Sequence, residues 1–155
     1  MKNNVEFIAY AVKQAKAAEK YGFTRNECCG NLKTAIHQYW QYKELGIHSL
    51  SKKKEIPRSE MAKKVPLSEC VIEHSVPQMV IVNMLMDMDK VTGIKVKNIL
   101  KKYYAVALVT FKENKILGAK GLRSKMPDDW DKKDLLARYK KVGINIKECL
   151  TSRCS

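Results

Sequence analysis

The segment Tyr104–Val109 constrains the fold most, because it is apolar at all six positions. A run of that length and composition is typical of a strand that is buried on both faces. Thr110 and Glu113 follow it at the spacing of a capping box, in which each side chain binds a backbone N–H at the start of a helix. We therefore predict a strand near 104–109 that leads directly into a helix ending at about Leu117.

One other segment has the pattern of a strand. In Ser68–Val76, Cys70 and Ile72 alternate with side chains of the opposite face, which predicts a strand near 69–74. Between the two strands, Pro77–Tyr103 contains apolar residues at helical spacing, interrupted at Thr92-Gly93. The chain therefore predicts a small antiparallel sheet of two strands, with a helical insertion between them.

The remaining segments predict helices. The first third forms two helices that meet at Tyr21-Gly22, and a second capping box, Thr24 with Glu27, begins the second of them. A last helix ends at Gly143. The predicted fold class is helix-rich α+β: an N-terminal helical hairpin, then a β-β-α unit with a helical insertion, and a C-terminal helix.

The length of 155 residues predicts one domain with a sizeable core. Its expected parts are a helical hairpin (1–46), a basic linker with a short helix (47–66), a β-β-α core (67–143) and a tail (144–155). Tyr39, Trp40 and Tyr42 cluster in the hairpin, where packing between helices is favoured over stacking on bases.

Charge decides which partners are considered. The chain contains thirty Lys and Arg residues and sixteen Asp and Glu residues, which gives a net charge of +14. Nucleic acid is the most abundant polyanion in a cell, and phosphate contacts supply most non-specific affinity. We therefore expect a nucleic-acid partner, DNA more than RNA, ahead of an anionic membrane surface or a merely soluble basic surface.

The cellular location and the redox state of the cysteines are predicted from sequence patterns that we do not find. We find no apolar run of about 20 residues and no secretory signal, which favours a cytoplasmic protein without a membrane partner. The five cysteines form no C-x-x-C pair, so we expect reduced thiols rather than a disulfide framework or a zinc ribbon.

Catalytic chemistry is concentrated in Glu73-His74, at the end of the first predicted strand and shortly before Pro77. A carboxylate can hold a hard divalent cation, and a neighbouring imidazole can take a proton from water near neutral pH. These are the minimum parts for metal-assisted hydrolysis of a phosphodiester. A histidine at the end of a strand is also often only structural, and both interpretations stay open here.

With the strand–strand–helix order, residues 68–120 resemble the HNH, or ββα-metal (His-Me finger), nucleases. The resemblance implies that His74 is the general base and that Glu73 binds Mg²⁺ or Mn²⁺. It also implies a further metal ligand in the first turn of the later helix, at Asn114 or Glu113. The sequence departs from the family in the long helical insertion between the strands and in lacking a middle asparagine that would orient the histidine.

Basic segments supply candidate contacts to phosphate. Arg123 and Lys125 lie in a predicted turn, and Lys52, Lys53 and Lys54 lie in the predicted linker. For both segments, phosphate contact and a solvated charge run remain open. A further group of lysines lies on the outer side of the helix predicted before the second strand: Lys95, Lys97, Lys101 and Lys102.

The leading functional hypothesis is a metal-dependent endonuclease that hydrolyses DNA with His74 as general base. The alternatives are a non-catalytic nucleic-acid-binding or phage or plasmid accessory protein, and an inhibitor of a nucleic-acid-handling enzyme. Geometry separates catalysis from binding. Catalysis needs Glu73, His74 and the helix start at 113–114 to meet in one open cleft, whereas a binding protein needs only a positive surface.

Overall fold

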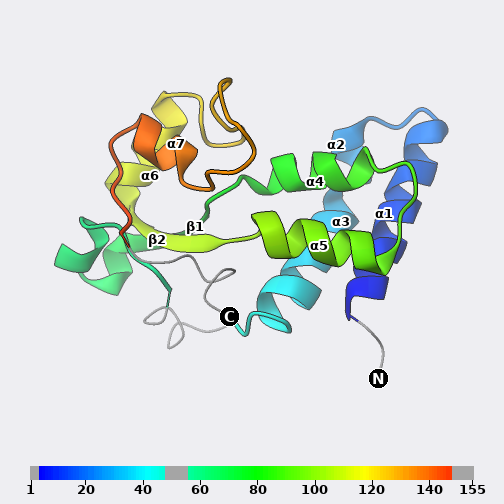
Figure 1. The fold of residues 1–155 in the computed structure, drawn as a ribbon, viewed down its shortest axis with the longest axis horizontal. Helices are drawn as coiled ribbons and strands as arrows, with labels where there is room; N and C mark the ends of the chain where they lie inside the picture. Colours follow the sequence, from blue (N-terminus) through cyan, green and yellow to red (C-terminus); the bar gives the residue numbers. More distant parts are fainter. Residues whose placement is uncertain (1–3, 48–55, 148–155) are drawn as a thin grey trace. The chain divides into compact units, whose positions relative to one another are not determined.

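A computed structural model describes residues 4–47 and 56–147 of the chain (Figure 1). It has the predicted fold class, a helix-rich α+β fold with one small antiparallel sheet. In the described part, no helix is both long and apolar enough to cross a membrane. Contacts divide the chain into a first unit, Met1–His48 with Ile81–Lys102, and a second unit, Ser49–Val80 with Tyr103–Ser155.

The N-terminal hairpin belongs to the first unit. Its first arm is α1 (Asn4–Lys20), which ends before Gly22, where φ is +93°. The expected capping box of Thr24 and Glu27 is present. The second arm is divided instead of being one helix, into α2 (Arg25–Cys28), α3 (Gly30–Ala35) and the π-helix η1 (Ile36–Tyr42).

The π-helix changes which aromatic residue enters the core. Ordinary helical spacing from Leu32 and Ile36 places Tyr39 on the buried seam. In the structure Trp40 is buried beside these positions and Tyr39 is only half-buried. The wider turn of a π-helix explains the difference, because its i→i+5 hydrogen bonds rotate the following side chains relative to an α-helix.

Two basic side chains of the hairpin hold the end of α4 (Gln78–Met86) within the first unit. The Lys16 ammonium donates to the carbonyls of Met86 and Met88, at 2.8 and 2.5 Å. The Arg25 guanidinium pairs with Asp87 at 2.8 Å. A cation at a helix C-terminus satisfies carbonyls that lack partners and complements the helix dipole.

The two predicted strands pair in the second unit. Strand β1 (Cys70–His74) is antiparallel to β2 (Val106–Thr110). The opposite edge of β2 is covered by residues 57–59, because the Leu108 N–H donates to the Pro57 carbonyl at 2.7 Å. Every residue of β2 is buried, as the apolar run predicted.

The helices of the insertion and the helix after the second strand form as predicted, whereas the last helix is shorter than predicted. The capping box of Thr110 and Glu113 begins α6 (Phe111–Ala119), and the insertion contains α5 (Gly93–Tyr103) after α4. The last helix, α7, covers only Ala137–Lys141. The carboxylates of Asp131 and Asp134 accept hydrogen bonds from backbone N–H groups two or three residues further along the chain, and the turns that these bonds form compete with helix there.

The buried side chain of Arg138, in α7, connects three segments of the second unit. It donates to the carbonyls of Ser75 at 3.0 Å and Leu122 at 2.8 Å, and also to the carbonyl of His74. Its charge is paired with the Glu73 carboxylate at 2.5 Å. With no exposed surface, the guanidinium is stable there only because partners satisfy it on several sides.

We predict that Arg138→Ala lowers the free energy of unfolding by about 3–5 kcal/mol, because it leaves the Glu73 carboxylate and several carbonyls without their partner. The matched control is Lys140→Ala, which removes the exposed pair with Asp134 and is expected to cost less than about 1 kcal/mol. Urea unfolding of both variants checks this. Equal losses in the two variants would contradict the structural role of Arg138.

Candidate functional site

Glu73 lies within β1, and its carboxylate is occupied by the Arg138 guanidinium. Only 16% of its side chain is exposed. A buried cation that is paired with one carboxylate competes directly with a metal ion for that carboxylate. As it stands in this structure, Glu73 has a structural partner rather than an open coordination position.

His74 ends β1 and contacts a buried aromatic residue. Its Nε2 lies 3.0 Å from the hydroxyl of Tyr104, and the two rings meet edge to face with centroids 5.1 Å apart. Backbone pairing continues past it, because the Ser75 N–H donates to the Ala105 carbonyl at 2.8 Å. In such a continuous strand, neighbouring side chains point to opposite faces, so Glu73 and His74 do not converge.

Glu113 lies at the start of α6 and is buried. Its carboxylate accepts hydrogen bonds from the Thr110 N–H at 2.8 Å and from the Ser59 hydroxyl at 2.7 Å. The next residue, Asn114, buries its Oδ1, which has no hydrogen-bond partner within the described chain. The capping box and Ser59 therefore account fully for Glu113, so that of these two residues only Asn114 has a buried acceptor without a partner.

The register of the sheet separates the two halves of the proposed metal site. His74 pairs with Val106, whereas Thr110, just before α6, pairs with Cys70. The two pairs are four residue steps apart along the strand, which is about 13 Å at the usual rise. Across residues 4–47 and 56–147 no group of three His, Cys, Asp or Glu side chains is placed to hold a metal ion. The hairpin does not bring Glu73 and His74 to the helix start at 113–114.

The predicted phosphate contacts are only partly described. Arg123 and Lys125 are both exposed, and Lys125 lies 3.8 Å from Asp128. The Arg123 guanidinium lies along α6, where a Cβ on Gly118 would be 3.3 Å from its Nη2. Lys52, Lys53 and Lys54 fall outside the described residues. Arg123 and Lys125 are thus available to an anionic partner on the surface of the second unit.

Lysines are exposed along α5, as the sequence predicted. Lys95, Lys97, Lys101 and Lys102 all lie on its outer side, and the helix contains no acidic residue. Helix α6 also exposes Lys112 and Lys115, while its single carboxylate, Glu113, is buried. Each helix therefore has an outer side on which its own charges are all positive.

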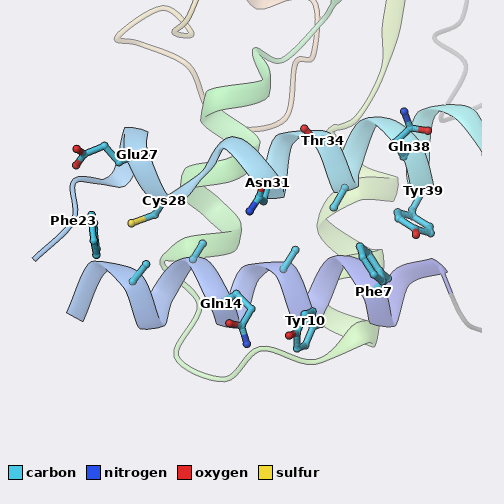
Figure 2. Close-up of a pocket in the computed structure, with 14 residues that line it drawn as sticks. Phe7, Tyr10, Gln14, Phe23, Glu27, Cys28, Asn31, Thr34, Gln38 and Tyr39 are labelled. Carbon is cyan, nitrogen blue, oxygen red and sulfur yellow. The ribbon is translucent and has the colours of Figure 1, made fainter. Parts of the chain in front are cut away.

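Sequence analysis missed an apolar groove between α1 and the α2–α3–η1 arm (Figure 2). Its volume is about 610 Å³, and alanines of α1 line it together with the exposed rings of Phe7, Tyr10 and Phe23. The positions of two aromatic residues in the helical pattern of α1 could have indicated this groove. Phe7 and Tyr10 lie away from the seam of Val5 and Ile8, so they had to face something other than the main core.

We predict that Glu73→Gln lowers the free energy of unfolding by about 1.5–3 kcal/mol, because Arg138 loses a charged hydrogen-bond acceptor. Melting temperatures measured with Mg²⁺, Mn²⁺ and EDTA separate this role from metal binding. If Glu73 has only a structural role, neither metal changes the melting temperature of wild type or of Glu73→Gln. A metal-dependent stabilisation of wild type that Glu73→Gln abolishes would identify Glu73 as a ligand instead.

Comparisons with known proteins add no relative. No protein-family model, no curated protein and no solved structure matches the chain. The resemblance to ββα-metal nucleases therefore stays a prediction from the residues quoted for it.

Proposed function

We propose that this protein binds nucleic acid through exposed lysine side chains and does so without cleaving it. One observation carries the proposal: internal contacts engage most of the described carboxylates, whereas many lysines have no such contact. The charged groups that remain available to a partner are therefore mostly positive.

The carboxylates are engaged in three ways. Some form ion pairs with a basic residue, as Glu73 does with Arg138 and Asp87 with Arg25. Glu27 and Glu113 close capping boxes. Asp131 accepts backbone N–H groups, which lowers its pKa and keeps it ionised in a local role. In each case the negative charge is directed toward the protein's own groups.

The lysines behave differently. Within the described ranges, eleven of them have no side-chain hydrogen bond, ion pair or ring contact: Lys13, Lys20, Lys64, Lys90, Lys95, Lys97, Lys101, Lys112, Lys115, Lys120 and Lys132. Ammonium groups on flexible stems are suited to phosphate oxygens, and such contacts give affinity without sequence preference. Helices α5 and α6 hold five of these eleven lysines.

The endonuclease hypothesis has less geometric support than binding. It requires Glu73 to exchange Arg138 for a metal ion, and it requires His74 to act at a distance from Asn114. Both requirements run against the pairing of β1 with β2 described above. It remains testable on the same protein preparation, because cleavage and binding have separate readouts.

We expect binding to duplex DNA that weakens steeply with salt. Each neutralised phosphate contributes about 0.9 to the slope of log K against log salt concentration. Fluorescence anisotropy with a labelled duplex, from low to moderate salt, measures that slope. Absence of binding at low salt, or affinity that does not change with salt, would remove the proposal.

A plasmid-nicking assay with Mg²⁺, Mn²⁺ and EDTA tests catalysis. For a non-catalytic protein we expect no metal-dependent nicking, and His74→Ala changes only stability, through the lost contact with Tyr104. A general base contributes about 10²–10⁴ in rate. Metal-dependent nicking by wild type that drops by this factor in His74→Ala, at unchanged DNA affinity, would restore the endonuclease hypothesis.

A further inference from the structure

We propose that α5 is the element that contacts bases, by lying in the major groove of duplex DNA. This inference rests on the proposed function and deepens it, because it names duplex DNA as the nucleic acid and α5 as the helix that contacts its bases. The argument depends on how the exposed side chains of α5 are arranged around the helix axis.

The exposed side of α5 has a central stripe with lysines on both flanks. At 3.6 residues per turn, Ile94, Asn98 and Lys101 fall along one line of the helix surface. Lys97 lies to one side of that line, and Lys95 and Lys102 lie to the other. A helix in the major groove has one phosphate strand on each side, which matches lysines on both flanks.

The opposite side of α5 anchors the helix. Val96 and Leu100 are completely buried, and Tyr103 is nearly so. The Lys95 N–H donates to the Thr92 hydroxyl at 3.3 Å, which satisfies a backbone group at the helix start. The outer stripe is therefore presented by a helix whose rotation about its axis is set by burial of the other face.

The chemistry of the stripe suits base edges in the major groove. An asparagine amide can bond adenine at two positions, and an apolar side chain can contact the thymine methyl group. The Asn98 side chain has no hydrogen-bond partner among the described residues, and Ile94 is 75% exposed. Both side chains are therefore open to contact with a base pair.

The dimensions and the charge around α5 agree with this placement. An α-helix with its side chains is about 10–12 Å across, and the B-DNA major groove is about 12 Å wide. One carboxylate lies at the N-terminal end, where Glu6 of α1 is against Gly93. Phosphate contact is therefore expected mainly from Lys97, Lys101 and Lys102, toward the other end of the helix.

A duplex whose major groove is filled tests the proposal. The probes are two duplexes of one sequence, one with ordinary cytosine and one with glucosylated hydroxymethylcytosine, whose sugars project into the major groove. We expect wild type to bind the filled duplex about 10-fold more weakly or worse, since good base contacts are worth that factor. We also expect weak binding to duplex RNA, whose major groove is too deep and narrow for side chains to read.

Matched charge variants assign the contact to a helix. Lys97→Gln with Lys101→Gln alters α5, and Lys112→Gln with Lys115→Gln removes the same charge from α6. The α5 variant is expected to lose affinity for the plain duplex and most of the penalty for filling the groove. The α6 variant is expected to keep that penalty in full. Both pairs are exposed, and circular dichroism confirms that each variant is folded.

Asn98→Ala gives an independent readout, because alanine favours helix and leaves the charge unchanged. Selection from random-sequence duplexes should show an adenine preference in wild type that Asn98→Ala loses, with a nearly unchanged salt slope. Tolerance of the filled groove by wild type, equal binding of duplex RNA, or loss of the penalty only in the α6 variant would overturn the assignment to α5 but leave nucleic-acid binding intact. Failure to bind any nucleic acid at low salt would overturn the proposed function itself.

Discussion

The second unit depends on the buried guanidinium of Arg138. Removal of a charge from water is costly, so the surrounding chain must supply an opposite charge and several acceptors in the right places. Glu73 supplies the charge, and carbonyls at 74, 75 and 122 supply the acceptors. One side chain of α7 therefore determines how the end of β1 and the loop after α6 are held together.

This constraint changes the meaning of the residues that looked catalytic. Glu73 neutralises Arg138, His74 contacts Tyr104, and Glu113 closes a cap with Thr110 and Ser59. The same polar chemistry that a metal site needs is engaged here in holding elements together. Among the described residues, the ammonium groups of Lys95, Lys97, Lys101, Lys112 and Lys115 have no such internal contact, and they are the basis for the proposed binding of nucleic acid.

Local signals were reliable where one short segment determines the outcome. Both capping boxes and both strands could be predicted, because a cap involves four consecutive residues and Val106–Val109 is apolar throughout. The π-helix that buries Trp40 and the shortened α7 could not, since they depend on packing and on competing side-chain hydrogen bonds. The grouping of 81–102 with the hairpin likewise depends on contacts between segments far apart in the chain.

The sequence by itself determined the fold class, the two strands, the caps and the excess of positive charge, because each follows from composition or from neighbouring residues. The candidate site was decided by tertiary structure. A Glu-His pair looks the same in sequence whether its carboxylate binds a metal ion or a buried arginine. Here the carboxylate of Glu73 binds Arg138, which lies 65 positions away in the chain. The strand register and the partner of each carboxylate are long-range properties, and these determine which charges remain for a ligand.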